Sequence, residues 1–91
     1  MPNIYTIWDN KGKFFSTPFY SRNDEVANRD FSNVVMNPDN PMSNSKGDYS
    51  LYRVGVFDGD SFDSPIFPTD KPILIVDGWK NGGVWFVWSG F

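Results

Sequence analysis

The segment SRNDEVANRDFSNVVMN, residues 21–37, predicts a helix, whereas the sequence on either side of it is typical of strands and turns. Its apolar side chains recur at the spacing of a core-facing helix, and they are Val26, Ala27, Phe31, Val34 and Val35. The opposite side carries Asn28, Arg29, Ser32 and Asn33. Ser21 or Asn23 can cap the start, and Pro38 ends the run. We expect this helix to cover one face of a sheet.

One acidic residue interrupts the apolar side of this helix. Asp30 projects near the stripe, between Val26 and Val34. Charged groups in such a place are usually paired, so we expect it to bind a basic residue or a loop amide. If Arg53 is that partner, its charge is structural and is not available to a ligand.

Two short runs before the helix predict a hairpin. Asn3–Asp9 (NIYTIWD) is rich in β-forming residues, residues 10–12 (NKG) supply turn chemistry, and residues 13–20 (KFFSTPFY) form the returning strand. Pro18 cannot donate to a ladder, so this strand should be an edge or should stop pairing near Thr17. Residues 38–48 have the composition of a loop.

Tyr49–Phe57 (YSLYRVGVF) is the clearest strand after the helix. Strict alternation places Tyr52, Val54 and Val56 on the core side, under the helix. The other face then carries Tyr49, Leu51, Arg53, Gly55 and Phe57. Residues 58–64 form an acidic turn, and residues 65–71 are an irregular connection.

The end of the chain predicts a second hairpin. Residues 72–79 and 84–89 are apolar and flank Asn81-Gly82, a strong hairpin signal. Both of its faces are apolar, so we expect one of them to contact another subunit through Trp79, Trp85, Phe86 and Trp88. Alternatively, the hairpin lies in the middle of the sheet under folded loops. Taken together, these elements predict one α+β domain, residues 1–91. It contains a mainly antiparallel sheet of about five strands, in the order ββαβββ, with one helix packed on one face.

Composition argues against an enzyme. The chain has no cysteine and no histidine, which removes disulfides, thiolate nucleophiles, imidazole bases and most transition-metal sites. Asp58 and Asp60 are spaced as in a calcium loop, but Asp63 and Thr69 stand where that loop needs glycine and glutamate. We therefore expect no metal and no cofactor. No leader pattern and no apolar run of about 20 residues is present, so we expect a soluble, cytoplasmic chain without a membrane partner.

Aromatic residues make up 19% of the chain, more than one small core readily uses, so some are expected to meet a partner. A net charge of −3 argues against phosphate binding over the whole surface and leaves room for a local patch. The predicted patch for single-stranded nucleic acid consists of Trp8, Lys11, Lys13, Tyr49, Arg53 and Phe57. The alternative is that these aromatics simply pack the sheet.

Several motifs occur in a fixed order along the first 58 residues. They are residues 4–9 (IYTIWD), 13–15 (KFF) with Pro18-Phe19, 23–24 (ND) followed by Ala27, Arg29 and Phe31, 37–38 (NP), and 48–55 (DYSLYRVG) with Phe57-Asp58. This order and spacing resembles the small nonstructural protein of gokushoviruses, single-stranded DNA phages of the Microviridae. The C-terminal hairpin at residues 72–89 is not part of the resemblance.

The resemblance implies a protein that is made in the infected bacterium, stays in the host cytoplasm and is not built into the virion. Family members are labelled DNA-binding by analogy with a protein that shifts phage replication towards packaged single strands. The first hypothesis is therefore a DNA-replication or packaging accessory that binds single-stranded DNA as a homo-oligomer. The rival hypothesis is an adaptor that engages a host or phage replication protein without contacting DNA.

Overall fold

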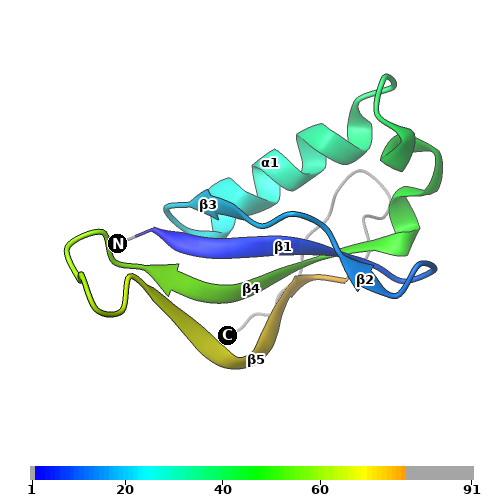
Figure 1. The fold of residues 1–91 in the computed structure, drawn as a ribbon. Helices are drawn as coiled ribbons and strands as arrows, with labels where there is room; N and C mark the ends of the chain where they lie inside the picture. The colour runs from blue at the N-terminus through cyan, green and yellow to red at the C-terminus, as the bar shows by residue number, and fades with distance from the viewer. Residues whose placement is uncertain (1, 78–91) are drawn as a thin grey trace.

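The computed structural model describes residues 2–77, which form an α+β fold. Its elements are, in order, β1 (Asn3–Asp9), β2 (Phe14–Phe15), β3 (Phe19–Ser21), α1 (Asp24–Met36), the 3-10 segment η1 (Pro41–Asp48), β4 (Tyr49–Phe57) and β5 (Ile66–Val76). The five strands are antiparallel to their neighbours in one sheet, and α1 lies across one face of it (Figure 1). The predicted fold class is confirmed.

The sheet is built around β1, which has pairing partners on both sides. On one side β4 runs antiparallel to it, from Asn3 opposite Val56 to Asp9 opposite Tyr49. On the other side the chain returns along β1 as two short strands, β2 and β3, with Pro18 in the gap between them. Proline has no N–H for the ladder, so the predicted break in pairing near Thr17 is confirmed. The strand order is β2-β1-β4-β5, with β3 also beside β1.

Helix α1 begins after Asn23, whose side chain accepts a hydrogen bond of 2.8 Å from the backbone N–H of Val26. Its buried stripe supplies part of a core that consists of Tyr5, Ile7, Ala27, Phe31, Val35, Leu51, Ile75 and Val76. Val26 and Val34 are only half-buried, because the stripe is centred closer to Phe31 and Val35 than predicted. The same rotation turns Asn28 inward, to 9% exposure, so its predicted place on the outer side of the helix is wrong.

Strand β4 contains a β-bulge that changes which residues face the helix. Tyr5 of β1 lies opposite Arg53, whereas the preceding residue, Ile4, lies opposite Gly55, so Val54 is an extra residue on β4. Leu51 is fully buried in the core under the helix. The predicted face assignment is therefore wrong before the bulge.

After the bulge the alternation of β4 is shifted by one residue. Val56 lies opposite Asn3, on the helix side, and Phe57 lies on the other side, where the strict alternation also placed them. The bulge thus restores the predicted faces for the second half of the strand.

Strand β5 starts earlier than predicted, because residues 66–68 pair with the end of β4. Phe57 lies opposite Ile66 and Val56 opposite Phe67, so the predicted irregular connection at residues 65–71 is wrong. Gly55 permits this pairing: a Cβ atom there would lie 2.8 Å from the backbone oxygen of Phe67. The acidic segment 58–64 remains a turn, as predicted.

The turn and second strand of the predicted C-terminal hairpin lie beyond Asp77, outside the described residues. The predicted interface residues Trp79, Trp85, Phe86 and Trp88 lie there as well. No helix within residues 2–77 is long and apolar enough to cross a membrane.

Candidate functional site

The face of the sheet opposite α1 carries a row of three aromatic rings. Trp8 and Phe15 are paired residues of β1 and β2, and their ring centroids lie 4.7 Å apart. Phe15 also meets Tyr52 of β4 edge-on, at 5.8 Å. Thr6, which lies opposite Tyr52 in the ladder, is only 4% exposed. Because Tyr5 faces the core, alternation along β1 places Thr6 and Trp8 on the opposite face.

A second aromatic pair lies farther along the same face. Tyr20 of β3 is paired with Ile4, and its ring lies 5.3 Å from that of Phe57. Ile4 is 6% exposed, whereas the Tyr20 side chain stays open to solvent. We call the five residues Trp8, Phe15, Tyr20, Tyr52 and Phe57 the outer aromatic face.

Sequence reasoning placed Trp8 and Phe57 on this face and missed the other three rings. Tyr52 was predicted in the core, because strict alternation was counted from the wrong residue of β4. Phe15 and Tyr20 lie on either side of Pro18, where the strand is interrupted. Counting alternate residues across this interruption assigns them to opposite faces, although both lie on the same face. The signal that could have found Phe15 is the turn at residues 10–13, which fixes its register opposite Trp8.

The two predicted lysines lie at the turn between β1 and β2, at the end of the sheet where Trp8 and Phe15 pair. The Asp9 carboxylate shapes this turn by accepting hydrogen bonds from the backbone N–H groups of Lys11 (2.9 Å) and Gly12 (3.1 Å). Lys13 follows with a φ of 61°, and its side chain is exposed. The Lys11 ammonium lies 3.5 Å from Asp48, but such surface pairs bind weakly and leave it accessible.

Arg53 and Tyr49 are not on this face, so their predicted placement there is wrong. One guanidinium nitrogen of Arg53, Nη1, donates to both carboxylate oxygens of Asp24, at 2.9 Å each. The charge of Arg53 therefore fixes the start of α1 to β4 and is already neutralised. Tyr49 packs against the core under the helix. The possibility that Arg53 is structural is confirmed, with Asp24 as its partner in place of Asp30.

Tyr5 joins the same cluster from β1. Its hydroxyl donates to Asp24 at 2.5 Å and accepts from the side-chain nitrogen of Asn3 at 3.0 Å. Burial, followed by the hydrogen bond to Asp24, raises the pKa of Tyr5 to about 12. Asp24 thus connects α1 with two strands, and we call Asp24, Tyr5 and Arg53 the Asp24 cluster.

The described residues of the sheet offer stacking surfaces and accessible cations. Within residues 2–77 no three histidine, cysteine, aspartate or glutamate side chains gather as a metal site would require. What the outer aromatic face can do is present flat rings, two of them well exposed, to a planar or apolar ligand.

Comparison with known proteins places the chain in a phage family. A family model described as Phage ORF5 protein matches residues 2–80, which runs past the first 58 residues where the motifs lie. No curated protein and no solved structure matches the chain. Since the family model covers most of the chain, the protein belongs to the Phage ORF5 protein family.

Proposed function

We propose that this protein is a nonstructural phage protein that binds single-stranded DNA through its outer aromatic face, as an accessory of DNA replication or packaging. The observation that carries the proposal is the presence of two groups of rings on the face opposite the helix, in which Phe15 is 41% and Tyr20 is 57% exposed. Aromatic rings on an open sheet face stack with the bases of single strands in other nucleic-acid-binding folds. Membership of a phage family supports a role in infection, and the motif order favours the gokushoviruses of the Microviridae.

The spacing of the exposed rings suits more than one base. Phe15 and Tyr20 lie on the same edge of the sheet and five residues apart, which corresponds to roughly 15 Å of extended chain. Trp8 and Tyr52 flank Phe15 and are themselves half-buried, so they support its ring from two sides. A single strand that follows this edge would reach Lys11 and Lys13 at the β1–β2 turn.

The charges of this face set how binding depends on salt. Arg53 is engaged by Asp24, so Lys11 and Lys13 are the two predicted cations that remain accessible there. With two phosphate contacts, the logarithm of the binding constant should fall with the logarithm of salt concentration at a slope of about −1.4. Stacking then supplies most of the affinity, which accords with the net charge of −3.

Fluorescence anisotropy with a labelled oligothymidylate at low salt tests the proposal. The Phe15→Ala and Tyr20→Ala variants, at the two exposed rings, should each bind more weakly by about 5- to 150-fold, the loss of roughly 1–3 kcal/mol for one stacked base. The matched control is Phe62→Ala, because Phe62 is 97% exposed in the β4–β5 turn and makes no ring contact with the outer aromatic face. Absence of salt-sensitive binding at micromolar protein would refute the proposal.

We further propose that the protein acts as a homo-oligomer in the host cytoplasm and is absent from the virion. An oligomer would place several outer aromatic faces along one strand and raise the total affinity without new contacts. Light scattering of the purified chain tests the oligomer, and a clean monomer at high concentration contradicts it. Peptide mass spectrometry of purified virions and of the host lysate tests the location.

The second candidate function is an adaptor that engages a host or phage replication protein without contacting DNA. It is favoured by the acidic balance of the chain and by the loss of Arg53 from the binding patch. Capture from infected-cell lysate distinguishes the two functions, because a partner retained after nuclease treatment supports the adaptor, whereas one released by nuclease supports DNA binding.

A further inference from the structure

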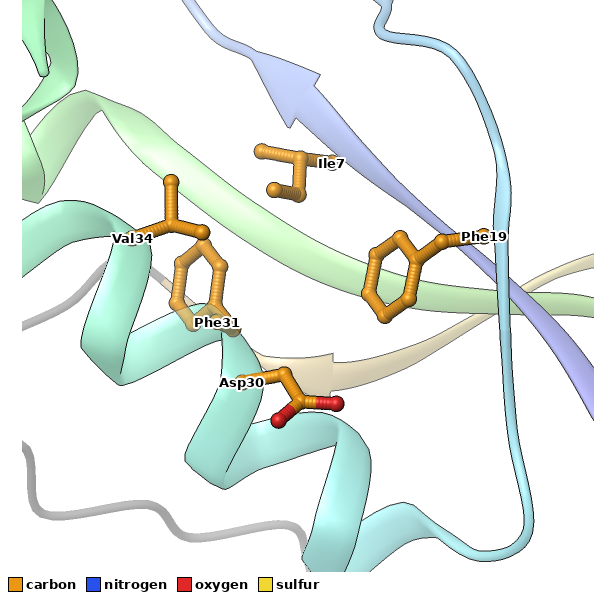
Figure 2. Close-up of a pocket in the computed structure, with 5 residues that line it drawn as sticks. All are labelled: Ile7, Phe19, Asp30, Phe31 and Val34. Atoms are coloured by element: carbon orange, nitrogen blue, oxygen red, sulfur yellow. The ribbon is translucent and has the colours of Figure 1, made fainter.

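A hollow of about 250 Å³ lies between α1 and the edge of the sheet, on the face opposite the outer aromatic face. It is lined by Ile7, Phe19, Asp30, Phe31 and Val34. Figure 2 shows the rings of Phe19 and Phe31 on two sides of it and the Asp30 carboxylate at its edge. The lining is thus apolar, with one acidic group.

Core contacts hold the walls of this hollow in place. Phe31 is fully buried and Ile7 is 7% exposed, so both belong to the core. The ring of Phe19 stacks on that of Tyr5, with centroids 5.9 Å apart, and Tyr5 is itself fixed by Asp24. The hollow therefore needs no rearrangement of its walls before a ligand enters, which lowers the entropic cost of binding.

The volume of the hollow selects the size of its occupant. A cavity of about 150 Å³ is large enough to bind benzene, and sites for small organic ligands begin at about 300 Å³. A volume between these limits suits one large apolar side chain, such as that of phenylalanine or leucine.

Asp30 selects the charge beside that side chain. Its carboxylate is exposed, and among the described residues it has no hydrogen bond or ion pair, contrary to the pairing expected from the sequence. A ligand that fills the hollow removes water from one side of this carboxylate, which is costly unless the ligand brings a cation. A nucleic acid brings phosphates of the same sign and is disfavoured here.

We propose that this hollow docks a segment of a partner protein in which a large apolar side chain stands next to a lysine or arginine. The apolar side chain enters between Phe19 and Phe31, and its basic neighbour pairs with Asp30. Because the hollow and the outer aromatic face lie on opposite sides of the sheet, such a partner and a DNA strand can bind at the same time. The proposal goes beyond DNA binding and stands if that function fails.

Titration of the ¹⁵N-labelled full chain with the dipeptide acetyl-Phe-Lys-amide, followed by NMR, tests this proposal. The expected result is saturable shifts in the millimolar range at the amides of Phe19, Asp30, Phe31 and Val34. Acetyl-Phe-Glu-amide should bind roughly two- to fivefold more weakly, as for one exposed ion pair. Acetyl-Gly-Lys-amide lacks the apolar side chain and should produce no saturable shifts at these positions.

Variants separate the charge from the hollow. Asp30→Asn should abolish the preference for lysine over glutamate and leave the fold intact, which the same spectra report. The matched control is Glu25→Gln, an identical change of charge on an exposed residue of the same helix that does not line the hollow, and it should keep the preference. Equal affinity of the two phenylalanine peptides for the unchanged chain, shifts confined to the outer aromatic face, or no shifts at all would each overturn the proposal.

Discussion

Replacing Asp24 with alanine should destabilise the fold strongly, because one carboxylate holds the helix to two strands. The Asp24→Ala change removes the acceptor of the Tyr5 hydroxyl and of both hydrogen bonds from Arg53. It leaves a buried hydroxyl without its acceptor and a guanidinium, whose side chain is 28% exposed, without its counter-charge. The helix start would then lose its side-chain attachment to both β1 and β4.

The size of the effect follows from these contacts. A hydrogen bond to a charged group contributes about 1.5–3 kcal/mol, and the two bonds from one nitrogen of Arg53 are counted once. Partial exposure of Arg53 and Asp24 moves both contributions to the lower end of that range. The loss of the favourable interaction between a first-turn acid and the helix dipole is roughly offset by the higher helix propensity of alanine. The free energy of unfolding should therefore fall by about 3 kcal/mol, and the melting temperature by roughly 10–20 °C.

Urea unfolding and thermal melting, followed by circular dichroism, measure this loss. Glu25→Ala is the matched control, since Glu25 is the neighbouring acid in the first turn, is exposed and has no ion pair among the described residues. It should cost less than about 1 kcal/mol. If the two variants lose the same stability, the Asp24 cluster does not anchor the helix and the reasoning fails. A double variant with Arg53→Ala should lose less than the sum of the single losses, because each single change leaves a charge unpaired.

Three further predictions concern the backbone and the pH dependence. The pKa of Tyr5 is raised from 10.0 to about 12, so between these pH values the unfolded chain releases a proton that the folded chain keeps. Stability should fall by up to about 3 kcal/mol over this window and be unaffected below it, and Tyr5→Phe should remove this loss from urea unfolding curves. Gly55→Ala should lower the free energy of unfolding by about 1–3 kcal/mol, because its Cβ would lie 2.8 Å from a backbone oxygen. Gly47→Ala is the control and should be nearly neutral in the same assay, because a Cβ there has no atom within 4 Å. Lys13→Gly should raise the melting temperature slightly, because the φ of 61° strains a lysine by about 1–2 kcal/mol. This strain exceeds the conformational entropy that glycine loses on folding, and a lower melting temperature would contradict the prediction.

Local signals in the sequence predicted much of the fold. Asn23 and Pro38 bracket α1 because capping and the missing proline N–H act within one turn of the chain. Pro18 marks the gap between β2 and β3 for the same local reason. The bounds of β4 also match the prediction, since its residues favour strands along their whole length.

The signals that failed depend on contacts between distant parts of the chain. Arg53 can face the helix only because Asp24, 29 residues earlier, neutralises it, and no local pattern links the two. The bulge at Val54 then breaks the count of alternating residues on which the face assignment rested. Residues 66–71 contain Pro68 and several polar side chains, yet they belong to β5, because β4 offers residues 66–68 a partner edge.

The candidate site was predicted in part for the same reasons. Trp8 and Phe57 were placed correctly on the outer face, but Phe15, Tyr20 and Tyr52 emerge only from the pairing register of three strands. Asp30 attracted attention because it broke a pattern, and its place beside an apolar hollow depends on how α1 packs against β3.

The extra residue Val54 also determines how this protein can tolerate mutation. Before it, the odd-numbered positions of β4, such as Leu51 and Arg53, hold the helix in place, so substitutions there should be limited by folding. After it, the odd-numbered position Phe57 belongs to the outer surface and contacts Tyr20, so substitutions there should affect the proposed DNA binding more than the attachment of the helix. One extra residue therefore lets a single strand serve both faces of the sheet, and a change at the outer surface leaves the attachment of the helix unchanged.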